Sequence, residues 1–327
     1  MGVSGSVLAV DAGNSKTDVA LIAPDGSVSR TGRAGGFQPS RAGTAAAVDV
    51  IAAALAAAGL ATTGRSPLAG HVSACLANAD FPEEERELAA EIGRRGWART
   101  TEVRNDTFAL LRAGLPAGAE PCGVAVVCGA GINCVGMTPD GRTARFPAIG
   151  VLSGDWGGGG GLAEEAMWHA ARAADGRGGP TELAAALPRH FGLDSMERLI
   201  GALHLGGIPR GRLHELVPVL FEVAAGGDPT ARSLVDRQAD EVVAMASVAL
   251  DRLGLLGAEV PVVLGGSVLA ARHPLLHDRI AQRLAERAPR ARITVIGAAP
   301  VLGAGLLGLD AVAAGRPAYE KLRAHFG

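Results

Sequence analysis

The sequence predicts an α/β protein with two related domains. Strand-like and helix-like segments alternate along the chain, which is the pattern of an α/β fold. The order strand, Gly-containing turn, strand, Asp-Gly turn, strand occurs near Val7 and again near Gly123. The chain of 327 residues is also longer than a domain with a single hydrophobic core usually is. We therefore expect two domains that each begin with the same three-stranded meander.

The first copy of this pattern opens the chain. Residues 7–23 read as two strands around a tight turn, and 27–33 as a third strand after Asp25-Gly26. The rest of this half alternates between helices, predicted at 44–60, 82–95 and from 107 onward, and strands, predicted at 71–77 and 101–103.

The second copy comprises strands at 123–128, 133–137 and 143–146. Further helices are predicted at 162–173, 181–191, 195–203, 211–225, 229–253, 275–287 and 301–314, and further strands at 260–264 and 292–296. We expect a first domain of residues 1–118, with a C-terminal helix at 305–327 packing back on it, and a second domain of residues 119–304. If the two domains face each other, both Gly turns line one cleft.

Composition narrows the class of protein. The net charge of −2 argues against a nucleic-acid partner, and the long apolar runs are broken by Gly and Pro, which argues against a membrane span. The four cysteines form no CxxC pair, so we expect buried, reduced thiols. The first residues enter the strand pattern directly, without a signal peptide, so a cytoplasmic protein is expected.

The first turn holds more polar groups than a hairpin needs. Gly13 lets the backbone approach a ligand, and Asp11 ends a strand where it would hold Mg²⁺ through water. Hydroxyl donors and a cation follow within a few residues: Asn14, Ser15, Lys16 and Thr17. The set suits the phosphate tail of a nucleotide, although it is no Walker A loop. A merely solvated hairpin is the alternative.

Two later turns repeat parts of this chemistry. Gly129-Ala130-Gly131 is weak evidence alone and gains weight as the duplicate of the first turn. Gly265-Gly266-Ser267 follows an apolar strand and would support an adenosine group, or be a plain strand-to-helix turn.

Asn105-Asp106-Thr107 precedes a predicted helix. One interpretation makes Asp106 the helix N-cap. The other makes it a general base at a strand end, which takes the proton of an alcohol that attacks a γ-phosphate.

Residues 153–161 combine an acid, Asp155, an aromatic, Trp156, and five glycines. Such a loop suits a polyhydroxylated ligand, and its amides precede a helix where an anion would bind. A mobile surface loop is the alternative.

Together these motifs resemble the actin-like ATPase superfamily, which includes sugar kinases. The closer resemblance is to the BadF/BadG/BcrA/BcrD-type ATPases, and within them to the N-acetylglucosamine kinase branch. It rests on DAGNSKT (11–17), NDTFAL (105–110), GAGINC (129–134), GDWGG (154–158) and APVLGAGLLG (299–308), which span nearly the whole chain in the family's order.

This resemblance implies two actin-like, ribonuclease H-like domains with a cleft between them. It also implies ATP-dependent, Mg²⁺-dependent phosphorylation of N-acetylglucosamine at its 6-hydroxyl, with Asp106 as the base and Asp11 at the metal. The residues implied for ATP are Asp11, Gly13, Asn14, Ser15, Lys16, Thr17, Gly129, Ala130, Gly131, Asn133, Gly265, Gly266 and Ser267. Those implied for the sugar are Gly36, Gln38, Asn105, Asp106, Gly150, Asp155 and Trp156.

The sequence departs from the family on the sugar side. Where the family usually has an Asn, hydroxyl residues, Trp-Gly and Asp-Glu-Gly-Ser, this chain has Phe37-Gln38, Ala130 with Ile132, Ile149-Gly150 and Asp155-Trp156-Gly157-Gly158. Glucosamine and N-acetylmuramic acid are therefore alternative substrates. Two other functions stay open: an ATPase activator that reduces a partner dehydratase, and a non-catalytic sugar or nucleotide sensor. Family members are often dimers, so a homodimer is a candidate assembly.

Overall fold

A computed structural model describes residues 5–60, 67–116 and 118–327. Its contacts divide the chain into two compact units. Unit 1 comprises the described residues of Met1–Ala125, Val135–Pro147 and Ile296–Gly327, and unit 2 comprises Val126–Cys134 and Ala148–Val295. The predicted first domain, 1–118, includes residues 1–4, 61–66 and 117, which lie outside the described residues. Its predicted boundaries stay a prediction.

Unit 1 is built on a five-stranded sheet in the order β3-β2-β1-β4-β5. The strands are β1 (Val7–Ala12), β2 (Thr17–Ile22), β3 (Val28–Ala34), β4 (Ala69–Leu76) and β5 (Ala98–Asn105). The first three are antiparallel neighbours, whereas β4 and β5 run parallel to β1. The register places Ala12, Leu76 and Asn105 in one row, so the carboxyl ends of three parallel strands share one edge.

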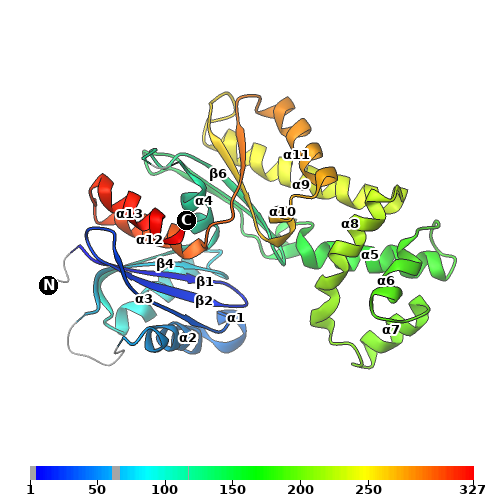
Figure 1. Ribbon diagram of the computed structural model, residues 1–327, viewed down its shortest axis with the longest axis horizontal. Helices are drawn as coiled ribbons and strands as arrows, with labels where there is room; N and C mark the ends of the chain where they lie inside the picture. The colour runs from blue at the N-terminus through cyan, green and yellow to red at the C-terminus, as the bar shows by residue number, and fades with distance from the viewer. Residues whose placement is uncertain (1–4, 61–66, 117) are drawn as a thin grey trace. The chain divides into compact units, whose positions relative to one another are not determined.

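Both faces of this sheet are covered by helices (Figure 1). These are α1 (Pro39–Ala42), α2 (Thr44–Ala57), α3 (Pro82–Arg94), α4 (Thr107–Gly114), α12 (Pro300–Ala311) and α13 (Arg316–Phe326). Leu8 and Val10 of β1 belong to a core with Ile51 and Leu55 of α2. The alternate β1 side chains face α12, where a Cβ at Gly308 would lie 2.3 Å from Val7 Cγ1. β1 is therefore apolar on both faces, as the continuous run in the sequence requires.

The second sheet has the order β10-β9-β6-β7-β8. Its strands are β6 (Gly123–Cys128), β7 (Ile132–Met137), β8 (Thr143–Arg145), β9 (Pro261–Gly265) and β10 (Arg292–Val295). Counted from its own first strand, this order is the same as in the first sheet. The α/β class with two sheets is confirmed, while the duplication of the whole meander stays a prediction.

Unit 2 carries most of the remaining helices. They are the 3₁₀ helices η1 (Gly150–Ser153) and η2 (Arg210–Glu215), and the α-helices α5 (Gly158–Ala174), α6 (Leu183–His190), α7 (Met196–His204), α8 (Leu216–Ala225), α9 (Pro229–Arg252), α10 (Ser267–Ala270) and α11 (Pro274–Arg287). α9 begins where the Asp228 side chain accepts the Ala231 N–H at 2.8 Å and a proline occupies the first turn.

Three element predictions need correction. The C-terminal helix expected at 305–327 is in fact two helices, because α12 ends at Ala311 and α13 begins at Arg316. The helix expected at 211–225 is split into η2 and α8. The helix expected from Leu162 begins at Gly158, inside the glycine run, because tertiary contacts described below outweigh the low helix propensity of glycine.

No helix in the described ranges combines the length and the apolar character that crossing a membrane demands.

Candidate functional site

Residues 36–38 hold the first turn, residues 13–16, in place. The Gly13 N–H donates to the Lys16 carbonyl at 2.8 Å, which closes the turn, and the Phe37 N–H donates to the Gly13 carbonyl at 2.9 Å. Gln38 Nε2 donates to the Asn14 carbonyl at 3.1 Å. Gly36 passes so close that a Cβ there would lie 2.1 Å from the same oxygen. Gly36 and Gln38 thus support the turn, and their contact with sugar stays a prediction.

Asp11 is a buried carboxyl at the end of β1, opposite Asp18 of β2 in the strand register. Burial, and then the charges of Asp106 and Asp18, raise the pKa of Asp11 to about 8, with Lys16 acting in the opposite direction. A buried carboxyl beside other carboxyls is a favourable place for a divalent cation.

The donor set near Asp11 fits Mg²⁺ rather than a fully protein-ligated metal. Within residues 5–60, 67–116 and 118–327, no three His, Cys, Asp or Glu side chains are grouped so that they would hold a metal ion. Mg²⁺ is commonly held by one or two carboxylates, with waters and substrate phosphates completing the shell. Asp11 suits that arrangement.

Asp18 was missed by the sequence analysis. Lys16 Nζ lies 3.3 Å from Asp18 Oδ2, and Arg33 Nε and Nη2 donate to the two oxygens at 2.5 and 3.1 Å. Burial would raise the pKa of Asp18, but hydrogen bonds from Arg33 and Lys16 outweigh it and lower that pKa. Asp18 therefore stays charged and positions Lys16. The signal was an acid inside an otherwise apolar strand.

Asp106 follows the end of β5, and its N–H donates to the Leu76 carbonyl at 3.2 Å. Its side chain caps no amide of α4. Asn105 Oδ1 instead accepts the Thr107 N–H at 3.0 Å, and Asn105 Nδ2 donates to Asp80 Oδ1 at 2.8 Å. Burial raises the pKa of Asp106 to about 6, opposed by hydrogen bonding to Thr107. Asp106 thus occupies the N-cap position of α4 without a side-chain capping hydrogen bond, and its role as a general base stays a prediction.

The second turn, Gly129–Gly131, is closed by a 3.0 Å hydrogen bond from the Gly129 N–H to the Gly131 carbonyl. The start of α5 packs directly on it. The Gly159 N–H donates to the Gly129 carbonyl at 2.7 Å, and the Gly160 N–H to the Ala130 carbonyl at 2.8 Å. At Gly158, where φ is +71°, a Cβ would lie 2.4 Å from the Gly131 carbonyl carbon. Glycine is required there because of this close approach.

These contacts overturn two interpretations of the glycine run. It is no mobile surface loop, since residues 158–161 form the first turn of α5 and Gly158 and Gly159 are buried. Nor are its amides open to an anion: the Gly158 N–H donates to Gln238 Oε1 at 2.8 Å, and the next two bind the turn.

The third turn lies against the second. A Cβ at Gly266, where φ is +82°, would lie 2.3 Å from the Cys128 carbonyl oxygen. Ser267 then begins α10 and lines a pocket of about 590 Å³ that also touches Gly129 and Ala130. The structure therefore brings the second and third turns together, within unit 2.

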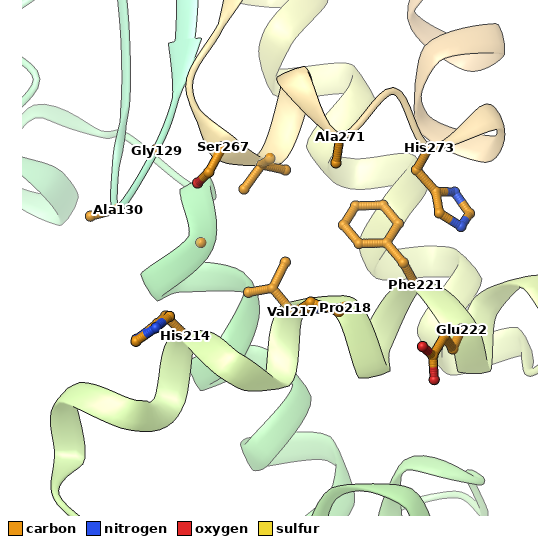
Figure 2. A pocket seen from close by; sticks show the side chains of 12 residues that line it. Gly129, Ala130, His214, Val217, Pro218, Phe221, Glu222, Ser267, Ala271 and His273 are labelled. Carbon is orange, nitrogen blue, oxygen red and sulfur yellow. The ribbon is translucent and has the colours of Figure 1, made fainter. Parts of the chain in front are cut away.

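Different residues line the two ends of this first pocket (Figure 2). Gly129, Ala130 and Ser267 lie at one end. At the other, the rings of Phe221 and His273 lie 4.7 Å apart at 35°. Its long wall consists of His214, Val217, Pro218, Phe221 and Glu222 of η2 and α8. Their spacing of three and four residues is that of one helix face, a signal in the sequence that was not used.

A second pocket of about 600 Å³, also within unit 2, meets the same turn. It is lined by Ala130 and Gly131 and by the predicted sugar residues Gly150, Asp155 and Trp156. Asp155 Oδ2 accepts the Gly150 N–H at 3.0 Å and the Ser153 hydroxyl, and so closes η1. Trp156 Nε1 donates to Glu165 Oε1 at 3.0 Å, and Arg237 lies 4.1 Å from the Trp156 ring centroid.

Asn133 lies at the start of β7, where its Oδ1 accepts the Cys134 N–H at 2.7 Å. In sum, Asp11, Lys16, Asp18 and Asp106 gather in unit 1, and the second and third turns with Asp155 and Trp156 gather in unit 2.

Two curated proteins resemble the chain. One is N-acetyl-D-glucosamine kinase of Dictyostelium discoideum, 28% identical over 210 residues, which are 64% of this chain and 65% of the relative. The other is N-acetylmuramic acid/N-acetylglucosamine kinase of Clostridium acetobutylicum, 25% identical over 193 residues, which are 59% of this chain and 62% of the relative. The matched region thus spans slightly less than two thirds of each relative.

Among solved structures, a proposed N-acetylglucosamine kinase from Chromobacterium violaceum superposes with a TM-score of 0.69 at 22% identity. The superposition covers 94% of this chain and all of the other. At that identity the likeness shows that the two chains share a fold. The family model of the BadF/BadG/BcrA/BcrD ATPases matches residues 8–308. The chain therefore belongs to the BadF/BadG/BcrA/BcrD ATPase family.

Proposed function

We propose that this protein is an ATP-dependent amino-sugar kinase that phosphorylates N-acetylglucosamine at the 6-hydroxyl. The observation that carries the proposal is Asp106, a carboxyl with a pKa raised to about 6 beside the buried Asp11. Both curated relatives are kinases of N-acetylglucosamine, and the family is one of ATPases.

The first pocket is the proposed donor site. The end with the Phe221 and His273 rings suits a nucleobase. The other end, with Ala130 and Ser267, suits phosphates. The N–H groups of Ala130 and Gly131 donate to no protein acceptor in the part of the chain that the structure describes. They are the amides that we assign to the transferring phosphoryl group.

The second pocket is the proposed acceptor side. It meets the first pocket at Ala130, so a donor phosphate at the turn would face a sugar beside Asp155 and Trp156. Indole rings and carboxylates are suited to sugar C–H faces and hydroxyls. Lys16, held by Asp18, is the cation that we propose for the phosphate charge.

The chemical step follows from these assignments. Asp106 takes the proton of the 6-hydroxyl, the hydroxyl oxygen forms a bond to the γ-phosphorus, and the bond between that phosphorus and the ADP oxygen breaks. Mg²⁺ at Asp11 would neutralise charge on the phosphates. Asp106 acts as a base only when ionised, so its raised pKa keeps it close to the operating pH.

The cysteines do not favour the alternative of an iron–sulfur activator. Burial raises the pKa of Cys75, Cys128 and Cys134, so these thiols are poor sources of thiolate ligands.

The test is an ADP-release assay over glucose, glucosamine, N-acetylglucosamine and N-acetylmuramic acid, with wild type and Asp106→Asn. We expect release to depend on N-acetylglucosamine, and kcat of the variant to fall by about 10² to 10⁴ with nearly unchanged ATP affinity. Wild-type turnover in Asp106→Asn would refute the assignment of the base. Loss of ATP affinity would instead indicate a disturbed fold or donor site.

A further inference from the structure

Gln238 on α9 is a completely buried polar side chain with a partner at each end. Its Oε1 accepts the Gly158 N–H at 2.8 Å, and its Nε2 donates to Cys128 Sγ at 3.5 Å. One amide group thereby joins α9 to the start of α5 and to the end of β6.

Both partners of Gln238 adjoin the second turn. Cys128 is the residue before Gly129, and Gly158 precedes the two amides that hold the turn's carbonyls. Gly157 also leaves space for Gln238, because a Cβ at position 157 would lie 2.3 Å from Gln238 Oε1. The residues around the turn thus leave room for the Gln238 side chain between them.

An amide suits this position. Gly158 presents a donor and Cys128 presents a sulfur atom, and the Gln238 amide pairs with both. An apolar side chain would leave a buried N–H unpaired at the first turn of α5.

We propose that Gln238 is a positioning residue for phosphoryl transfer. It holds Gly129–Gly131, through Gly158 and Cys128, in the conformation that directs the Ala130 and Gly131 amides at the donor phosphate. The inference rests on the proposed function, since it assigns those amides to the phosphoryl group. Amides stabilise a transition state only if they are oriented before the reaction begins.

The kinetic test compares Gln238→Met with Gln238→Glu. Met has similar length and no acceptor, whereas Glu keeps an acceptor for the Gly158 N–H. We expect kcat to fall by about 10- to 100-fold in Gln238→Met, with the KM for the sugar unchanged, and by less in Gln238→Glu. Equal kcat in wild type and Gln238→Met, or equal losses in both variants, would overturn the inference.

The structural test does not depend on activity. Amide hydrogen exchange of peptides that contain residues 129–131 and 158–160 should be faster in Gln238→Met than in wild type, well below the melting temperature. Leu250→Ala is the control: it opens a buried cavity on α9 about 18 Å along the helix from Gln238, at 1.5 Å per residue, and should leave these two peptides unchanged. Unchanged exchange in Gln238→Met would overturn the positioning role.

This design distinguishes a failure of the proposed function from a failure of the inference about Gln238. A wild-type protein with no sugar-dependent ADP release would contradict the proposed function, and the exchange experiment would still decide whether Gln238 orders the turn. If Gln238→Met gives no folded protein, Gln238→Asn replaces it. Asn keeps both polar groups on a shorter side chain, and the same changes in kcat and exchange are expected.

Discussion

Asp106 and Asp11 have raised pKa values for one main reason, which is that burial penalises the charged form. The neighbouring carboxylates of Asp106 and Asp18 raise the pKa of Asp11 further. The two groups nevertheless lead to different predictions, because we propose that Asp106 accepts a proton from the substrate and that Asp11 holds a cation.

With Asp106 as the proposed base, its protonation should set the acidic limit of activity. Because the base form is required and its pKa is about 6, kcat/KM should be constant above about pH 7 and fall about tenfold per pH unit below 6. A pH profile of the ADP-release rate, at saturating Mg²⁺, measures this. A profile that stays flat down to pH 4.5 would contradict the assignment.

Asp11 makes stability depend on pH in the unusual direction. Its pKa is about 8 in the fold and near the ordinary value of 3.8 when unfolded. Between these values the native state binds a proton that the unfolded state has lost, so the free energy of unfolding decreases as the pH rises from about 4 to 8.

Replacing Asp11 by Asn removes this penalty. Without Mg²⁺, the variant should therefore melt at a higher temperature than wild type at pH 8, and the difference should vanish near pH 4. Its phosphoryl transfer should be lost. Thermal unfolding at both pH values tests this, and a variant that is less stable than wild type at pH 8 would contradict it.

At the scale of elements, the start of α5 depends on which of its glycines is changed. At Gly158 a Cβ meets the Gly131 backbone and φ is positive, whereas at Gly161 a Cβ meets open space. The run therefore contains both required and dispensable glycines.

Gly158→Ala and Gly161→Ala form a matched pair. Gly158→Ala should displace the second turn and lower kcat/KM on the order of 100-fold. Gly161→Ala should leave the second turn in place, with a far smaller effect on kcat/KM, although Gly161 borders the second pocket. It should raise the free energy of unfolding by about 0.4–1 kcal/mol, because it reduces the freedom of the unfolded chain. Comparable activity of both variants would contradict the packing described here.

The elements also show what the sequence makes predictable. Apolar alternation and Asp-Gly turns located β1, β2 and β3, because these signals are local. The beginning of α5 was misjudged because glycine is a poor helix former, and the reason for it here, contact with Gly129–Gly131, joins residues far apart in sequence. Gln238 was invisible for the same reason, since its partners are Gly158 and Cys128.

Of the candidate site, the motif residues were predictable and the pocket walls were not. Gly13, Gly129 and Gly266 stand out in their motifs, but the structure requires glycine only at Gly266 among these three, where φ is +82° and a Cβ would lie 2.3 Å from the Cys128 carbonyl oxygen. The wall formed by Val217 and Phe221 looks like any apolar helix face in the sequence, and only the fold shows that it borders a pocket.

At the scale of the whole molecule, unit 1 is completed by the last part of the chain. α12 lies so close to α4 that a Cβ at Gly303 would be 1.7 Å from the Ala109 carbonyl oxygen. Arg112 of α4 also donates to both oxygens of Asp310 of α12, at 2.8 and 3.1 Å. The stability of unit 1 thus depends on this approach of segments that are far apart in sequence.

Gly303→Ala should lower the free energy of unfolding by about 1–3 kcal/mol, because the helices must separate. Gly93→Ala is the control on exposed α3, where a Cβ meets nothing, and should be neutral or stabilising by up to ~1 kcal/mol. Denaturant titrations compare the two. Equal stability of Gly303→Ala and wild type would contradict the close packing of α12.

The central claim is that the whole protein transfers the γ-phosphate of ATP to the 6-hydroxyl of N-acetylglucosamine. ³¹P and ¹H NMR of a reaction with ATP, Mg²⁺ and that sugar measures it directly. The account predicts one phosphomonoester coupled to the two C6 protons, formed in equal amount to ADP and absent with Asp106→Asn. ADP formation that is independent of every sugar offered, or a phosphate attached at another carbon, would contradict it.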